Sequence, residues 1–320
     1  MDDILIMSTI QKEINSFKQQ LKKHFKFSDN LKFESILGIK ITTHNTKTFI
    51  SQNQYCKNIL QKFNYQNINT KSTPMENKLL IEEITTNINY ELTKKFQEMI
   101  GSLLYLMIHT RPDISFAITR LSQFNKNANS TLIQHAKRIF QYINKTKDYG
   151  IYVDPSDKMI LKGYCDASYA EHNSNKKSIS GYVFFLDDTP ISWKTQTQKN
   201  IAKSTMEAEL YSIESAISEA IWLRNILEEL NFKQLTTEIF CDNQAAILFS
   251  TDQIRNARNK HINVKYFYAK EKIENKEIKL TYISTKDMIA DGLTKPLSKN
   301  LFNKFINDLN ILQIKKECCN

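Results

Sequence analysis

Apolar positions in the second half of the chain follow two periods, one typical of strands and one typical of helices. Residues 161–166 alternate between apolar and polar side chains, and residues 238–241 form a second short apolar run, so both segments are predicted to be strands. Between them, apolar side chains recur every three or four residues and predict one long helix that Ser204 or Thr205 can cap. The apolar stripe of this helix consists of Leu210, Ile213, Ile217, Ala220, Leu223 and Leu227.

Four acidic residues occupy the ends of these predicted elements. Asp166 ends the first strand, and Glu209 lies near the start of the long helix. Asp242 follows the second strand and precedes a short helix that opens with a polar cap. Asp291 lies in another short helix, which Pro296 stops. The order along the chain is therefore strand acid, helix acid, strand acid, helix acid.

Carboxylates that converge repel one another, so such a cluster predicts bound hard divalent cations, with Mg²⁺ preferred for oxygen ligands. Two such ions about 3.5 to 4 Å apart clamp a phosphodiester, activating water and stabilising the departing oxygen. The chain has 34 acidic residues. Four ordinary surface acids are therefore an equally valid interpretation of these positions taken alone.

Sequence motifs around these acids favour a metal-binding cluster over four ordinary surface acids. Seven blocks follow one another in this order: GYCDASY, SGYVFFLDDTPISWKTQTQ, STMEAELYS, IWLRNILEEL, FCDNQAAI, KHINVKYF and DMIADGLTKPL. Together, over about Lys158 to Leu297, they closely resemble the ribonuclease H domain at the end of copia-type retrotransposon polyproteins. The resemblance implies an α/β fold of the RNase H-like type, a mixed five-stranded sheet with flanking helices. It also implies an endonuclease that hydrolyses the RNA strand of an RNA/DNA hybrid.

In that family the matching acids hold the metals, so the resemblance implies that Asp166, Glu209, Asp242 and Asp291 are the catalytic and metal-binding residues. Two Mg²⁺ ions are expected, with Mn²⁺ as a substitute. Glu209 is preferred to Glu207 because it is followed by a leucine, as in related enzymes, and because Glu207 shares the helix face poorly. The stretch after Asp166, Ser168 to Glu171, departs from the usual family pattern.

Two further residues are candidates for contacts with the substrate, Asn243 and His261. His261 matches a histidine block of the copia-type domain, where an imidazole near a phosphodiester can donate to phosphate. A structural histidine at a helix start explains the same position equally well.

The first half of the chain resembles the end of a copia-type polymerase. Asp2 and Asp3 match the tail of the aromatic-x-Asp-Asp turn of reverse transcriptases, and an amphipathic helix is predicted from Ile10 to Phe25. The segments FESILGIKI, FISQ and STPME, which follow, resemble segments of that polymerase. The resemblance implies an incomplete α+β palm and thumb remnant. Polymerase activity is expected to be absent, since the earlier metal-binding aspartate and the fingers would lie upstream of Met1.

The predicted organisation has four parts. Residues 1–76 are a palm and thumb remnant, 77–150 a thumb and connection segment, 151–310 the RNase H-like domain and 311–320 a tail. The main boundary is placed near 148–150, just before the first expected nuclease strand.

Charge and composition agree with an intracellular protein that contacts nucleic acid. The resemblance implies an RNA/DNA hybrid as partner, together with the rest of the Pol polyprotein. Residues 1–150 contain 21 Lys plus Arg and 12 acids, whereas residues 151–320 contain 23 and 22. The basic excess in the first half suits contacts with phosphates, although an A/T-rich genome would also raise the lysine content. With five cysteines lacking paired zinc spacing and no apolar run of membrane-spanning length, an intracellular location in the cytoplasm or nucleus is expected.

Two other functions remain open at this stage. A catalytically decayed or repurposed nucleic-acid-binding protein would bind hybrid with steep salt dependence but without turnover. An integrase-type transferase shares the fold, but its glutamate comes last among the acids. Here the glutamate comes second, and this order favours ribonuclease H.

Overall fold

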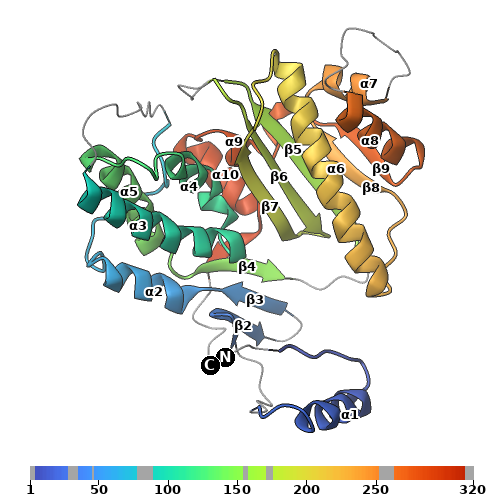
Figure 1. Ribbon diagram of the computed structural model, residues 1–320, viewed down its shortest axis with the longest axis horizontal. Coiled ribbons are helices and arrows are strands. Elements are labelled where there is room, and N and C mark those ends of the chain that lie inside the picture. Colours follow the sequence, from blue (N-terminus) through green and yellow to red (C-terminus); the bar gives the residue numbers. More distant parts are fainter. Residues whose placement is uncertain are drawn as a thin grey trace.

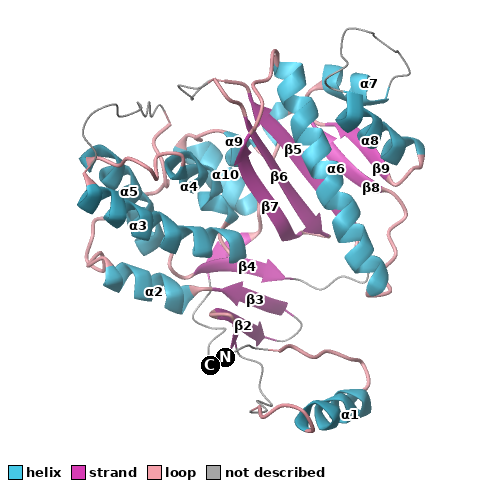
Figure 2. Cartoon of the chain, in the orientation of Figure 1, coloured by secondary structure: helices cyan, strands magenta, loops and turns pink. Residues whose placement is uncertain are grey.

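The computed structural model describes residues 4–27, 35–44, 47–77, 89–153, 158–170, 176–251 and 263–313. In this part of the chain, two five-stranded sheets and a set of helices form the molecule (Figure 1). Figure 2 shows that helices gather on both sides of the larger sheet, whereas the smaller sheet lies beneath them. None of the described helices is long and apolar enough to cross a membrane.

The larger sheet, called the second sheet, is mixed. Its strands are Leu161–Ser168 (β5), Ile179–Leu186 (β6), Thr189–Thr197 (β7), Thr237–Cys241 (β8) and Ile278–Tyr282 (β9). The spatial order is β7-β6-β5-β8-β9, in which β5, β6 and β7 are antiparallel and β8 and β9 run parallel to β5. The mixed five-stranded sheet with flanking helices that the resemblance implied is therefore confirmed.

Alternation along β6 explains how one strand supports two apolar layers. Ile179, Val183 and Phe185 contact the core formed with the helices of the first half of the chain. Tyr182 and Phe184 point to the opposite face and join the core under α6. Because side chains of a strand alternate between faces, a strand buried on both sides must be apolar at nearly every position, and β6 is buried along seven of its eight residues.

Helices cover both faces of the second sheet (Figure 1). On one face lies α6, Thr205–Glu229, whose predicted stripe from Leu210 to Leu227 is buried. The remaining helices are Gln11–Lys22 (α1), Asn53–Lys62 (α2), Tyr90–His109 (α3), Pro112–Ile114 (η1), Ser115–Ser122 (α4), Ser130–Lys145 (α5), Gln244–Thr251 (α7), Asn263–Glu274 (α8), Thr285–Asp287 (η3), Asp291–Thr294 (α9) and Lys299–Asp308 (α10). Of these, α3, α4 and α5 lie on the other side of the second sheet, together with α9 and α10 (Figure 1).

The smaller, first sheet joins distant parts of the chain. Its strands are Ser35–Ile36 (β1), Ile39–His44 (β2), Lys47–Ser51 (β3), Tyr149–Val153 (β4) and Ile311–Gln313 (β10), all antiparallel in the order β1-β2-β3-β4-β10. The segment 149–153 was expected to begin the nuclease sheet, but it pairs with β3 and β10 instead. Residues 311–313, expected in a tail, form the other edge of this sheet. The limits of the four predicted parts remain a prediction.

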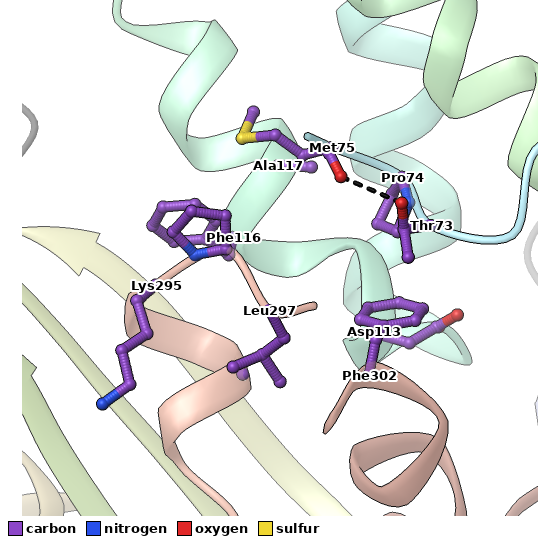
Figure 3. Close-up of a pocket in the computed structure, with 11 residues that line it drawn as sticks. Thr73, Pro74, Met75, Asp113, Phe116, Ala117, Lys295, Leu297 and Phe302 are labelled. Carbon is purple, nitrogen blue, oxygen red and sulfur yellow. Dashed lines mark hydrogen bonds between the residues drawn. The ribbon is translucent and has the colours of Figure 1, made fainter. Parts of the chain in front are cut away.

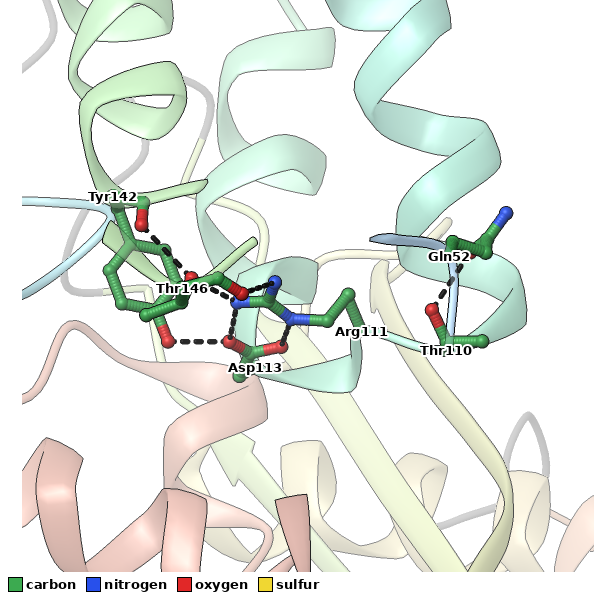
Figure 4. Close-up of polar contacts among 6 residues, drawn as sticks. All are labelled: Gln52, Thr110, Arg111, Asp113, Tyr142 and Thr146. Atoms are coloured by element: carbon green, nitrogen blue, oxygen red, sulfur yellow. Dashed lines mark hydrogen bonds and ion pairs between the residues drawn. The ribbon is translucent and has the colours of Figure 1, made fainter. Parts of the chain in front are cut away.

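A buried ion pair ties η1 to α5 (Figure 4). The Arg111 guanidinium donates from Nε to Oδ1 of Asp113 at 2.9 Å and from Nη2 to Oδ2 at 2.7 Å. It also donates to the carbonyl and the hydroxyl of Thr146, at 3.0 and 2.7 Å, while the Tyr142 hydroxyl donates to Asp113 at 2.6 Å. With both charged groups satisfied in this way, their burial is tolerated.

Candidate metal centre

Three of the four predicted acids come together at one edge of the second sheet. Asp166 lies in β5, Asp242 directly follows β8, and Asp291 is the first residue of α9. One carboxylate oxygen from each lies within 4.8 Å of the other two. Strands β5 and β8 are parallel neighbours, so their carboxyl ends meet at the same edge, and so do Asp166, near the end of β5, and Asp242, just after β8.

The third acid reaches this edge because α9 approaches β6 closely. Gly181 is the register partner of Asp166 on β6. A Cβ atom at Gly181 would lie 2.8 Å from Cβ of Leu293 and 2.8 Å from Cγ2 of Thr294. Since non-bonded carbon atoms prefer about 3.5 to 4.0 Å, a glycine is required here for α9 to bring Asp291 beside the strand.

Glu209 lies beside Asp242 and Cys241, with one ligand atom of each within 4.8 Å of the others. Its side chain is buried, and the Oε2 atom has no hydrogen-bond partner. The neighbouring Glu207 is used differently, because its carboxylate accepts from the backbone N–H of Lys203 at 2.7 Å and from the Tyr211 hydroxyl at 3.1 Å. The structure therefore places Glu209, and not Glu207, toward the cluster.

Three polar side chains that the sequence interpretation overlooked contact the acids. The Thr294 hydroxyl donates to Asp166 Oδ2, and the Thr285 hydroxyl donates to Asp242 Oδ2 at 2.7 Å. Lys295 Nζ lies 2.8 Å from Asp291 Oδ1, an i,i+4 ion pair. The i,i+4 spacing of Asp291 and Lys295 was the signal that could have identified one of these contacts, whereas the two threonine contacts join segments far apart in the sequence.

Burial disfavours the ionised form of three of these acids. It raises the pKa of Asp166 to about 7, with the nearby Asp291 adding to the effect and the Thr294 hydrogen bond opposing it. Burial likewise raises the pKa of Glu209 well above its ordinary value, with Asp166 and Cys241 contributing less. The pKa of Asp291 is raised by burial, while its hydrogen bond to Lys295 works in the other direction. A cation would relieve these costs, and the cluster could hold a metal ion.

The other predicted site residues have separate outcomes. The Asn243 side chain accepts from the backbone N–H of Ala246 at 3.0 Å and so caps α7, which leaves its substrate contact a prediction. His261, Asp2 and Asp3 lie outside the described residues. The expected short helices after Asp242 and at Asp291 are present as α7 and α9.

A pocket lies close to the acids but is distinct from them (Figure 3). It is lined by Thr73, Pro74, Met75, Asp113, Phe116, Ala117, Gly292, Lys295, Pro296, Leu297 and Phe302. In Figure 3 the Lys295 ammonium points away from the other labelled residues of the pocket, and it pairs with Asp291. The pocket is therefore a separate recess between α4 and the segment that follows α9.

The mixed sheet and its strand order define an RNase H-like fold, and comparisons with known proteins extend this assignment. The family profile described as "Reverse transcriptase (RNA-dependent DNA polymerase)" matches residues 1–77. The Retrovirus-related Pol polyprotein from transposon TNT 1-94 of Nicotiana tabacum is 35% identical over 308 residues, covering 94% of this chain and 23% of the relative. The corresponding polyprotein from transposon RE1 of Arabidopsis thaliana is 30% identical over 316 residues, covering 98% of this chain and 21% of the relative.

The chain belongs to the copia-type retrotransposon Pol polyproteins and corresponds to a portion of them, with a reverse transcriptase segment followed by an RNase H-like fold. It spans less than a quarter of the length of the two relatives. Among solved structures, RNase H1 from Halobacterium salinarum is 16% identical, with a TM-score of 0.32 over 46% of this chain and 98% of that chain. At that TM-score the fold assignment rests on the strand order of the second sheet.

Proposed function

We propose that the chain carries an RNA/DNA-hybrid ribonuclease whose site consists of Asp166, Glu209, Asp242 and Asp291. The observation that supports this most directly is the convergence of Asp166, Asp242 and Asp291 within 4.8 Å at the edge of the sheet. Three carboxylates so close together, two of them with pKa values raised by burial, are stable as anions only beside cations.

The donor set fits hard divalent cations. All four side chains offer carboxylate oxygens, which suit Mg²⁺, and Mn²⁺ accepts the same ligands. Glu209 adds a buried oxygen without a hydrogen-bond partner, which is the state expected of a ligand that awaits its cation. When bound, two ions would activate a water molecule and stabilise the departing oxygen of a phosphodiester.

The chain's own residues position the ligands. Thr294 and Thr285 donate hydroxyl protons to Asp166 and Asp242, which fixes the orientation of both carboxylates. The Lys295 ammonium neutralises part of the charge on Asp291. Such supporting contacts commonly change metal affinity or activity by about 10- to 100-fold when they are removed.

The partner in this proposal is a hybrid duplex, recognised through its backbone and the ribose 2′-hydroxyl of the RNA strand. The excess of basic residues over acids in residues 1–150 supports phosphate contacts by the first half of the chain. The remainder of the Pol polyprotein is a second proposed partner. A hybrid substrate of this kind implies an intracellular location, in the cytoplasm or the nucleus.

The test is cleavage of a labelled RNA/DNA hybrid by the purified chain in Mg²⁺, with duplex DNA as the substrate control. We expect only the RNA strand to be cut. Asp166→Asn should lower the rate at least about 100-fold, because a metal ligand supports several kcal/mol of transition-state stabilisation.

The matched control variant is Asp188→Asn. Asp188 has a side chain that is 89% exposed, and among the described residues it pairs with Lys162, at 3.0 Å, so this change should leave cleavage intact. Equal rates for the wild-type chain and Asp166→Asn would refute the proposal. Tight, salt-sensitive hybrid binding without any product would instead support the alternative of a nucleic-acid-binding protein without catalysis.

A further inference from the structure

A second set of ligand atoms beside the aspartate cluster includes sulfur. Among the described residues, Glu209, Cys241 and Asp242 each offer one atom within 4.8 Å of the other two. Cys241 is the last residue of β8, and Asp242 follows it directly. We propose that these three residues form an inhibitory site for a thiophilic divalent cation such as Zn²⁺ or Cd²⁺, distinct in chemistry from the Mg²⁺ site.

The buried oxygen of Glu209 supports a ligand at this position. The residue is only 6% exposed, and its Oε2 has no hydrogen-bond partner. An unpaired buried carboxylate oxygen is costly unless a cation or a donor satisfies it. The same side chain belongs to the set that contains sulfur, so a cation there would satisfy Glu209 and Cys241 together.

The distances suit a small borderline-soft cation. Zn²⁺ binds sulfur at about 2.3 Å and carboxylate oxygen at about 2.0 to 2.2 Å, so the ligand atoms of one ion lie within about 4.5 Å of each other. The three atoms already lie within 4.8 Å, and small side-chain rotations would complete the site. Asp242 is partly exposed, which leaves a path from solvent on that side.

Sulfur decides which cation is preferred. Cys241 is a free, buried cysteine, and its Sγ accepts from the backbone N–H of Asn243 at 3.5 Å. A second free cysteine, Cys165, lies beside it on the neighbouring parallel strand. Mg²⁺ prefers oxygen ligands, whereas Zn²⁺ and Cd²⁺ accept thiolate and exceed Mg²⁺ in affinity for such sites. On binding, the Cys241 thiol releases its proton to solvent as the metal–sulfur bond forms.

Inhibition follows because Asp242 belongs to both sets. It is a member of the Asp166, Asp242 and Asp291 cluster and also of the set with Glu209 and Cys241. A cation held by sulfur would withdraw Asp242 and Glu209 from the oxygen-only arrangement. This effect on cleavage rests on the proposed ribonuclease function, whereas the binding itself does not.

The binding test uses the full chain without nucleic acid. Cd²⁺ is titrated while the ultraviolet charge-transfer absorbance of a cadmium–thiolate bond is followed, and Zn²⁺ binding is measured by calorimetry. We expect the absorbance to vanish in Cys241→Ser and the Zn²⁺ affinity to fall at least about 10-fold. Cys56→Ser, which alters a buried free cysteine at 2% exposure in the other core, should retain both signals.

The activity test measures the Zn²⁺ concentration that halves Mg²⁺-dependent cleavage, relative to each protein's own rate without Zn²⁺. This concentration should rise at least about 10-fold in Cys241→Ser and stay unchanged in Cys56→Ser. If Cys241→Ser fails to fold, Cys241→Ala serves in its place, and Glu209→Gln must weaken Cd²⁺ binding to the folded chain. An unchanged cadmium–thiolate signal in the Cys241 variants would overturn the inference. A chain that binds Cd²⁺ through Cys241 but never cleaves hybrid would refute only the proposed ribonuclease.

Discussion

Without metal, the acid cluster should make the folded protein less stable as the pH rises. The pKa of Asp166 is about 7 in the fold and 3.8 in its ordinary state. Because the folded pKa is the higher one, the folded chain binds this proton more tightly. The resulting penalty is absent below about pH 3.8, grows between that value and pH 7, and is complete above pH 7.

The size of the penalty follows from the shift. One pKa unit corresponds to 1.36 kcal/mol. The Asp166 carboxyl group therefore costs about 4 kcal/mol at pH 8, where it is ionised in the folded chain, and about 2 kcal/mol at pH 5, where the folded chain keeps it protonated while the unfolded chain ionises it. Burial is the main cause of the raised pKa, so solvent does not screen the Asp166 carboxylate and this free-energy cost is not diminished. The variant Asp166→Asn removes the charge and should stabilise the metal-free protein by amounts of this order at each pH.

The assay is denaturant unfolding of both proteins in EDTA at pH 5 and pH 8, followed by circular dichroism. The unfolding free energy is extrapolated linearly to zero denaturant, with the same dependence on denaturant concentration for both proteins. The difference between the two proteins isolates Asp166 from other groups that titrate. In excess Mg²⁺ the order should reverse, because only the wild-type chain gains full binding energy from the metal. If Asp166→Asn stabilises the metal-free protein equally at both pH values, or does not stabilise it, the predicted ionisation penalty at Asp166 is refuted.

Two further predictions concern the scaffold and the approach of α9. Asp113→Asn should lower the unfolding free energy by about 3 to 5 kcal/mol, because it leaves Arg111 buried without its charge partner. The control Glu76→Gln breaks an ion pair whose acid is 60% exposed and should cost at most about 1 kcal/mol in the same denaturation assay. Equal losses of unfolding free energy in the two variants would contradict this prediction. Gly181→Ala would place a Cβ 2.8 Å from two side-chain atoms of α9, so stability should fall by about 1 to 3 kcal/mol and Mg²⁺ affinity by calorimetry should weaken. An unchanged Mg²⁺ affinity would show that α9 does not need this glycine.

Local sequence signals predicted the elements that carry the acids. The Ser204 cap, whose side chain accepts from the N–H of Glu207, and the apolar stripe that follows it suffice to predict α6. Alternation and the polar cap predicted β5, β8 and α7 in the same way. These signals act between residues a few positions apart, so they are readable along the chain.

The partners of each element were less accessible. Strand β4 pairs with β3 and β10, which lie about 100 and 160 residues away in the sequence. A strand carries no mark of which edge it will join, because backbone hydrogen bonds are the same for every partner. The burial of Arg111 had no local signal either, since an Arg-Pro-Asp segment is equally compatible with a solvent-exposed turn.

The sequence by itself determined the family resemblance, the mixed α/β class of the second half and the four acids, because short motifs and periodicity report local chemistry. Only the tertiary structure decided that Glu209, Cys241 and Asp242 lie together, that Lys295 neutralises Asp291 and that Gly181 admits α9. Those relations depend on how β5, β6, β8, α6 and α9 meet at one edge of the sheet. Distances of a few ångströms between such distant segments arise from packing, which no local pattern encodes.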